Sequence, residues 1–345
     1  MGNGFINRKS ININNLLIYY FIMKNILVIG GAGYIGSHTC KLLQNQNYNI
    51  CVFDNLTTGC EEFCKYGSFY KGDITLKNDL ESCFEIFKPE IVIHFAALAH
   101  VDESIYHPDD YYRVNVIGTI NILDTMNKFG CDKIVYSSSC ATYGIPEKLP
   151  ILETTPQEPI HPYGMSKLMT EKIIFDYHKA FSIKYIILRY FNVVGNDPDC
   201  EVGEWHNPEK RILPNIIKAA IYNKEFNIFG NDYPTVDGTC DRDYIHVLDL
   251  ANAHIRAIEK VEHIQDLFNL GNGKPISNLQ LIKKVEEISG LQIKINWHDR
   301  RQGDPPTLYC DNTKSVNILR HTNQYTLDDI VRTSYHWYKK RLLTE

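Results

Sequence analysis

Three polar side chains near the middle of the chain have the types and the spacing of an acid–base site. Tyr163 and Lys167 are four residues apart, so on a helix they share one face. Tyrosine is a poor base at neutral pH because its ordinary pKa is about 10, but a nearby ammonium group favours the phenolate. Ser139 ends an apolar run upstream, from which its hydroxyl can bridge the phenol and a substrate oxygen. This set predicts proton removal from an alcohol, coupled to hydride transfer from its carbon.

A glycine-rich turn near the N-terminus is a candidate phosphate-binding loop. The segment GGAGYIGS places Gly30, Gly33 and Gly36 between an apolar run and a helical pattern. Glycine lets the backbone approach a pyrophosphate closely, and the helix that follows offers free N–H groups. Asp54 ends the next apolar run, where a carboxylate accepts hydrogen bonds from ribose hydroxyls and repels a 2′-phosphate. The combination predicts an NAD site rather than an NADP site.

Short apolar runs alternate with amphipathic stretches between residues 24 and 192. The runs at 24–31, 48–55, 68–74, 89–97, 132–139 and 184–192 predict strands, and the stretches at 37–46, 76–88, 109–130 and 162–181 predict helices. This alternation is typical of right-handed β-α-β units and a parallel sheet covered on both faces. Ser139 then ends the fifth strand and Tyr163 lies on the helix that follows, at the edge where such sheets bind ligands.

The chain divides into parts of different character. We expect an N-terminal extension over 1–22, with Met23 as an alternative start, and an NAD-binding Rossmann domain over 23–192. The mixed helices and strands that follow predict a smaller α+β lobe over 193–345, some of whose segments return to the first domain; the resemblance described below implies that this lobe is a UDP-sugar-binding domain. The fold class is therefore α/β, a Rossmann-type doubly wound parallel sheet with a C-terminal α+β lobe. The cleft between the lobes is the expected ligand site.

Composition excludes several classes of protein. With 36 Lys plus Arg against 41 Asp plus Glu, the net charge is −5, so we expect no nucleic-acid partner. The ten cysteines form no C-x-x-C motif, which favours reduced thiols, a cytoplasmic location and no metal. The apolar stretches at 16–23 and 26–36 are each shorter than the roughly 20 residues of a membrane span, so no membrane association is expected.

Longer motifs make a family resemblance specific. Besides the glycine loop and YGMSK, the chain contains RYFN at 189–192, FGNDYPT at 229–235, RDYIHVLDLA at 242–251 and RRQGD at 300–304. In this order they resemble the UDP-glucose 4-epimerases of the extended short-chain dehydrogenase/reductase group, from about Met23 nearly to the C-terminus. The resemblance implies reversible inversion at C4 of UDP-glucose and UDP-galactose, through a 4-keto sugar and enzyme-held NAD.

The resemblance also assigns residues to roles. It implies catalysis by Tyr163 as the base, Ser139 as its partner and Lys167. It implies NAD contacts from Gly30, Gly33, Tyr34, Ile35, Gly36, Asp54, Asn55, Asp73, Ile74, Phe95, Ala96, Ala97, Asn115, Tyr163, Lys167 and Phe191. It implies substrate contacts from Ser139 and Tyr163 at the sugar, Asn192, Arg242 and Arg301 at the diphosphate, Phe229 on the uracil, Asp304 at the uridine ribose and Leu308 in the sugar pocket. Because relatives often dimerise through the corresponding helices, it implies a homodimer through 109–130 and 162–182.

Two departures and several alternatives bear on these expectations. Ala99 stands where some relatives carry a lysine, which predicts weaker retention of NAD. Leu308 stands where some carry a tyrosine, which admits UDP-GlcNAc and UDP-GalNAc. A 4-epimerase of another UDP-sugar, UDP-xylose, UDP-arabinose or a UDP-uronate, stays open, as does a non-catalytic NAD-binding regulatory protein. A sugar dehydratase is disfavoured, because Cys140 and Ala141 follow Ser139 where it needs acids.

Overall fold

A seven-stranded sheet forms the larger part of the protein. The computed structural model describes residues 24–205, 209–301 and 304–344; the predicted extension over 1–22 lies outside the described residues. The sheet contains β1 (Asn25–Ile29), β2 (Asn49–Asp54), β3 (Ser68–Lys71), β4 (Ile91–His94), β5 (Lys133–Ser139), β6 (Lys184–Tyr190) and β10 (Asp266–Leu270). The strand order is β10-β6-β5-β4-β1-β2-β3, and every neighbouring pair is parallel. This confirms the predicted doubly wound sheet.

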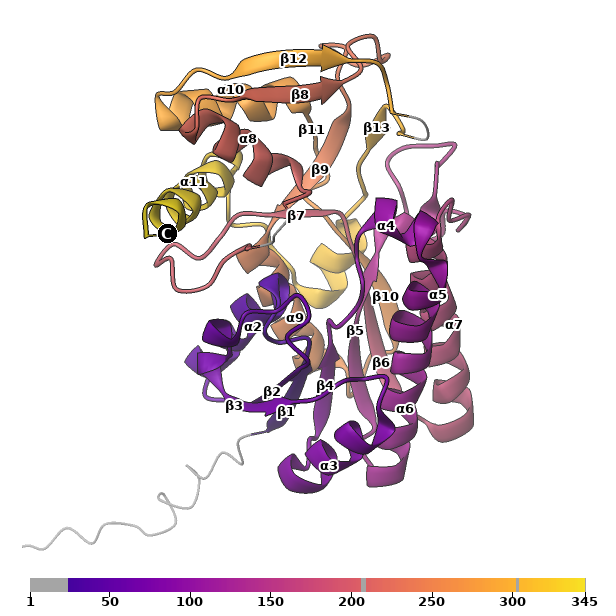
Figure 1. Ribbon diagram of the computed structural model, residues 1–345. Coiled ribbons are helices and arrows are strands. Elements are labelled where there is room, and N and C mark those ends of the chain that lie inside the picture. The colour runs from indigo at the N-terminus through magenta and orange to yellow at the C-terminus, as the bar shows by residue number, and fades with distance from the viewer. Residues whose placement is uncertain (1–23, 206–208, 302–303, 345) are drawn as a thin grey trace, which may run out of the picture.

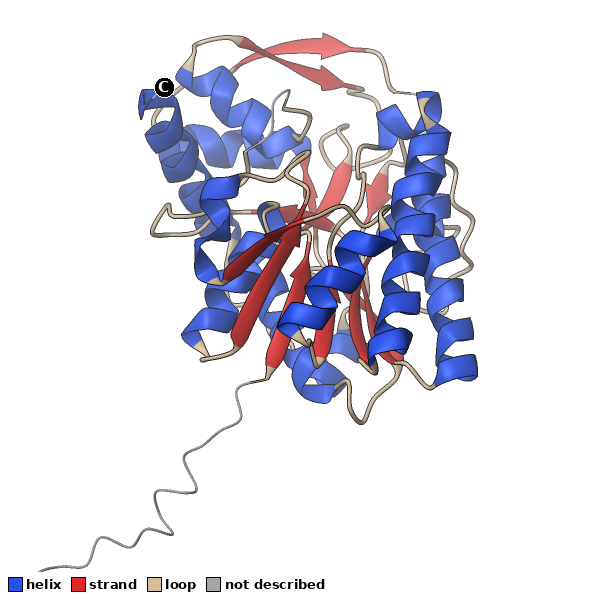
Figure 2. Cartoon of the chain, turned by 60° about the horizontal axis from the view of Figure 1, so that its bottom comes forward, coloured by secondary structure: helices blue, strands red, loops and turns tan. Residues whose placement is uncertain are grey.

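Helices cover both faces of this sheet (Figures 1 and 2). They are α2 (Tyr34–Asn45) and α9 (Val247–Lys260) on one face, and α3 (Lys77–Phe87), α6 (Gly118–Phe129) and α7 (Pro162–Phe181) on the other. Alternate residues of β1 explain why both layers are needed. Ile26 and Val28 are buried in the cluster that includes α2, whereas Leu27 and Ile29 are buried in the cluster that includes α3. A strand that is apolar on both sides requires cover on both sides.

The predicted helix at 109–130 is interrupted. It consists of α5 (Pro108–Tyr111), a π-helical turn over Tyr112–Ile117, and α6. α6 ends at Gly130, whose φ of +72° is the left-handed conformation that glycine favours at a helix end. The short helix α4 (Val101–Tyr106) precedes this group and borders the cleft.

A smaller lobe lies beyond the carboxyl ends of the large sheet (Figure 1). Its strands are β7 (Asn192–Val194), β8 (Glu225–Phe229), β9 (Asp241–His246), β11 (Pro275–Ser277), β12 (Lys294–His298) and β13 (Thr307–Leu308), and its helices are α8 (Ile212–Ile221), α10 (Asn278–Ser289) and α11 (Leu327–Thr344). β9 pairs with β7, β11 and β13, and β8 pairs with β12. β10 and α9 lie in the C-terminal half of the sequence, between elements of the smaller lobe, but they pack with the large sheet and its helices. The two lobes are therefore interleaved along the chain.

A helix that spans a membrane needs about 20 consecutive apolar residues. Among the described residues, no helix is both long and apolar enough to cross a bilayer.

Candidate active site

Two adjoining cavities follow the carboxyl ends of the large sheet. The larger, about 820 Å³, is bordered by the glycine loop and by the ends of β2, β4, β5 and β6. The smaller, about 680 Å³, lies in the second lobe between α8, β8 and β9. Asn192, Ile212 and Tyr244 line both, so the two cavities are neighbours. A ligand bound in one cavity would therefore lie close to a ligand bound in the other.

The glycine loop is shaped for close approach of a phosphate. Gly30 has a φ of +82°, and a Cβ atom there would lie 2.5 Å from the backbone nitrogen of Ala96. A Cβ atom on Gly36 would lie 2.3 Å from the carbonyl oxygen of Gly30. Only glycine fits at these two positions. The N-terminus of α2 opens on this loop without a side-chain cap, so its N–H groups are available to a dinucleotide pyrophosphate.

Asp54 at the end of β2 is held by the backbone around it. Its carboxylate accepts hydrogen bonds from the N–H of Ala32 at 3.0 Å and of Leu56 at 2.8 Å. Burial nevertheless raises its pKa. Nearby, the Asn55 amide donates to the Asp73 carboxylate at 3.0 Å. These two residues, which are also predicted to contact the cofactor, therefore lie together at the same edge of the sheet. This pair of carboxylates makes the adenosine end of the cavity acidic, which suits ribose hydroxyls better than a phosphate.

The three catalytic candidates converge at the carboxyl end of β5. Tyr163 is the second residue of α7, and the Ser139 side chain lies close enough to its phenol to lower the pKa of that phenol. The Lys167 ammonium is buried and donates to the carbonyl oxygen of Ser137 at 2.7 Å. It also lies 5.0 Å from the centre of the Tyr136 ring. All three predicted side chains line the larger cavity.

Burial dominates the ionisation of this group. It raises the pKa of the Tyr163 phenol, and the Ser139 side chain acts in the opposite direction and lowers it. Burial also lowers the pKa of Lys167 to about 7. Each group is thus shifted towards its neutral form. The predicted lowering of the Tyr163 pKa by Lys167 together with the nicotinamide stays a prediction.

Most predicted cofactor residues lie in one wall. Those that line the larger cavity are Gly30, Gly33, Tyr34, Ile35, Gly36, Asp54, Asn55, Asp73, Ile74, Phe95, Ala96, Ala97, Tyr163, Lys167 and Phe191. Asn115 is an exception, because it is buried behind this wall. Its amide donates to the Leu98 carbonyl and to the Ser166 hydroxyl, both at 3.0 Å, and its oxygen accepts from the Leu98 N–H at 2.8 Å. The side chain therefore holds the loop after β4, while Ala99 lines the cavity beside it.

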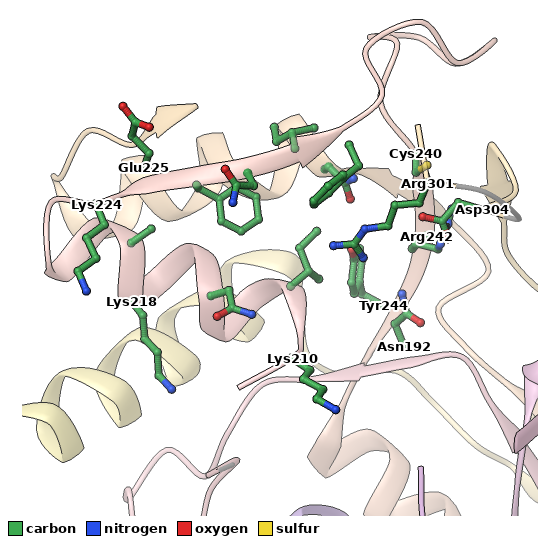
Figure 3. Close-up of a pocket in the computed structure, with 18 of the residues that line it drawn as sticks. Asn192, Lys210, Lys218, Lys224, Glu225, Cys240, Arg242, Tyr244, Arg301 and Asp304 are labelled. Carbon is green, nitrogen blue, oxygen red and sulfur yellow. Dashed lines mark hydrogen bonds and ion pairs between the residues drawn. The ribbon is translucent and has the colours of Figure 1, made fainter. Parts of the chain in front are cut away.

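The predicted substrate residues gather in the smaller cavity. Its walls contain Asn192, Phe229, Arg242, Arg301 and Asp304 (Figure 3). The Arg301 guanidinium lies 4.0 Å from the centre of the Phe229 ring. Arg242 is fixed by hydrogen bonds to the carbonyls of Asp241 and Pro305, at 2.8 and 2.9 Å. Two arginines beside an aromatic ring can hold a diphosphate and a planar base.

Leu308 lies away from both cavity surfaces. It packs in a small apolar cluster with Cys140, Tyr143 and Phe191. Cys140 and Phe191 themselves line the larger cavity, so Leu308 supports its wall from behind rather than forming it. Its assignment to the sugar pocket rests on the resemblance, because some relatives carry a tyrosine at this position, and it stays a prediction.

Some residues of the site escaped the sequence analysis. Arg211 lines the larger cavity, where it forms an ion pair with buried Glu204 at 2.8 Å and lies 5.3 Å from the centre of the Tyr34 ring. Lys210 lines the smaller cavity and reaches Glu103 of α4 at 3.5 Å. The one signal in the sequence for these residues is the basic pair directly before the helix that begins at Ile212. This pair is far from the glycine loop in the sequence and comes close to it only in the folded chain.

Comparison with known proteins agrees with this geometry. Residues 26–271 match the NAD dependent epimerase/dehydratase family, and the chain belongs to that family. Within it, the chain is a member of the UDP-glucose 4-epimerase group. It is 43% identical over 320 residues to the UDP-glucose 4-epimerase of Rhizobium leguminosarum bv. trifolii, covering 92% of this chain and 98% of the relative.

Solved structures give the same answer. The UDP-glucose 4-epimerase from Brucella ovis in complex with NAD superposes with a TM-score of 0.88 at 44% identity, covering 91% of this chain and 98% of that one. The enzyme from Bifidobacterium longum in complex with NAD⁺ and UDP superposes with a TM-score of 0.87 at 36% identity, covering 92% and 99%. The fold is thus that of this group.

Proposed function

We propose that this chain interconverts UDP-glucose and UDP-galactose by inversion at C4, with NAD as a resident cofactor. The observation that carries the proposal is the convergence of Tyr163, Ser139 and Lys167 in the lining of the larger cavity, which adjoins the smaller one. The glycine loop and Asp54 fit a dinucleotide on one side of this point. The ring and the two arginines of the smaller cavity fit a uridine diphosphate on the other.

The side chains divide the chemistry between them. The glycine loop and Asp54 would hold NAD, which would supply a hydride acceptor for C4 of the sugar and, once reduced, a hydride donor for the opposite face of the 4-keto sugar. Tyr163 removes the proton from the O4 hydroxyl and restores it after inversion. Ser139 holds the phenol and the sugar oxygen in line, and Lys167 supplies positive charge that favours the phenolate. No net oxidation results, because the cofactor ends each turnover as it began.

The distribution of contacts suits a sugar that must rotate and present its opposite face. Arg242, Arg301 and Phe229 line the smaller cavity and provide charged and aromatic anchors for the nucleotide. The 4-keto sugar can then rotate about its bond to the diphosphate and present its other face. Tight binding of the nucleotide and loose binding of the hexose are what this reaction needs.

Product analysis tests the proposal. Purified protein incubated with UDP-glucose should give UDP-galactose on anion-exchange chromatography, without accumulation of NADH. Parallel incubations with UDP-GlcNAc and UDP-xylose define the sugar range. Tyr163→Phe should reduce turnover about 10²–10⁴-fold, the usual contribution of a general base, and leave bound NAD unchanged. Tyr106→Phe is the control, because Tyr106 is 79% exposed on α4. A Tyr163→Phe variant with parental turnover would refute the assignment of the base.

The assembly and location are also proposed. Ile117 and Met169 are large exposed apolar side chains within 109–130 and 162–182, the two ranges predicted to form a homodimer. Analytical ultracentrifugation should show a dimer that Ile117→Glu with Met169→Glu converts to a monomer. All ten cysteines are free thiols, which supports a reducing, cytoplasmic environment. Fractionation of cells that produce the full chain would test this location.

A further inference from the structure

Glu171 continues the series of residues that α7 directs at the end of β5. It lies one helical turn beyond Lys167 and two turns beyond Tyr163 on the same helix. The hydroxyl of Ser138 donates to its carboxylate. Ser138 lies between Ser137, whose carbonyl accepts from Lys167, and Ser139, whose side chain acts on Tyr163. Three successive residues of β5 therefore each meet one residue on the same face of α7.

The carboxylate of Glu171 is buried and fully engaged. Arg189 of β6 donates to it from Nε at 2.9 Å and forms an ion pair through Nη2 at 2.5 Å. The side chains of Arg189 and Glu171 are only 2% and 1% exposed. Gln157 adds a hydrogen bond at 3.1 Å. Because a buried ion pair is often no more stabilising than apolar residues of similar volume, stability alone is a poor explanation for this arrangement.

Lys167 has one acidic neighbour among the titratable groups packed around it in the described structure. Tyr163 and Glu171 face it from α7, Tyr136 from β5 and His94 from β4. Burial lowers the pKa of Lys167, and the charge of Glu171 acts against this and raises it. Burial lowers the pKa of His94 to about 3, so the imidazole is neutral beside the lysine. Glu171 thus compensates the charge of a buried ammonium.

We propose that Glu171 is a positioning residue for the epimerase reaction. Its carboxylate holds the end of β5 against α7, and it supplies a negative counter-charge one turn below Lys167. This inference rests on the proposed function, because Lys167 matters there through its effect on Tyr163. Glu171 is shielded from the cavity and acts through Lys167 and Tyr163.

The test compares two substitutions on one helix. Glu171→Gln removes the buried charge and keeps the size of the side chain, whereas Asp176→Asn removes a charge from a side chain that is 77% exposed. Turnover of UDP-glucose is measured against pH for both variants and the parent. For Glu171→Gln, kcat on the plateau should fall about ten- to a thousandfold and the acid limb should move to lower pH by about one to three units, because an unopposed lysine loses its proton earlier while Tyr163 still titrates at the higher pKa. Asp176→Asn should follow the parent, and bound NAD should be equal in all three.

Two further variants complete the test. Glu171→Asp restores the charge and should return the acid limb to the parental pH, even if turnover falls. If Glu171→Gln does not fold, Ser138→Ala tests the inference instead. This variant removes the hydrogen bond between the end of β5 and Glu171 and keeps the ion pair of Glu171 with Arg189. Its kcat should fall several-fold at unchanged KM. A folded Glu171→Gln variant with the parental profile, or a Ser138→Ala variant with parental kcat, would overturn the inference. A parent that does not epimerise UDP-glucose would instead refute the proposed function.

Discussion

The Arg301 guanidinium lies over the face of the Phe229 ring, 4.0 Å from its centre. The two residues come from segments about 70 positions apart in the sequence, and parallel pairing of β8 with β12 brings them together: Phe229 is in register with His298. Stacking restrains the plane of the guanidinium, and Figure 3 shows the Arg301 side chain among the residues that line the smaller cavity. This relationship places an aromatic surface and a phosphate-binding fork in one wall.

Loss of this fork should weaken substrate binding selectively. Arg301→Ala should raise KM for UDP-glucose about ten- to a hundredfold with little change in kcat, the range expected for hydrogen bonds to a charged group. Arg300→Ala is the matched control, because Arg300 pairs with Asp232 and stacks on Tyr233 instead. Steady-state kinetics on both variants distinguishes them. Equal KM values for the two would show that Arg301 does not contact the diphosphate.

Asp54 should determine the choice of dinucleotide. Its oxygens already accept two backbone hydrogen bonds, so a 2′-phosphate would meet a fixed negative charge. We expect NAD to bind at least a hundredfold more tightly than NADP, since repulsion of this kind is worth several kcal/mol. Isothermal titration calorimetry on cofactor-stripped protein measures both affinities. Comparable affinities would contradict the role assigned to Asp54.

The pH dependence should reveal the pair of Tyr163 and Lys167. The pKa of the phenol is raised by burial and that of the ammonium is lowered to about 7, so the parent should show a bell-shaped pH–rate profile. In Lys167→Ala the phenolate lacks its cation, so the rising limb should move to higher pH and the falling limb should disappear. Lys172→Ala, which changes an exposed lysine of the same helix, should keep the bell. A Lys167→Ala profile that coincides with the parent would exclude the lysine from the titration.

Local patterns predicted the fold and most of the cofactor wall. Gly30 and Asp54 were found from sequence because a strand, a glycine turn and a strand-end acid are signals within a few dozen residues. Asn115 and Leu308 were placed in the walls and lie behind them, since the face that a buried side chain presents depends on distant partners such as Leu98 and Phe191. The contact of Arg211 with the glycine-loop helix could not be predicted for the same reason.

Leu308 should affect sugar size indirectly. Because it packs behind Cys140 and Phe191, a tyrosine there would push these side chains towards the sugar. We expect the parent to interconvert UDP-GlcNAc and UDP-GalNAc beside UDP-glucose. Leu308→Tyr should reduce the acetamido reaction more than the glucose reaction, because overpacking costs about 1–3 kcal/mol and falls mainly on the bulkier ligand. Chromatographic rates for both substrates test this, and equal losses would show that Leu308 does not influence selectivity.

The central claim is that the hydrogen on C4 leaves the sugar and returns to it without exchange with water. UDP-glucose labelled with deuterium at C4 tests this most directly. After equilibration with the enzyme in ordinary water, mass spectrometry of the separated UDP-galactose should show deuterium fully retained at C4. Tyr163→Phe should give the same labelled product at a much lower rate. Loss of deuterium to solvent, or the absence of UDP-galactose, would contradict the account.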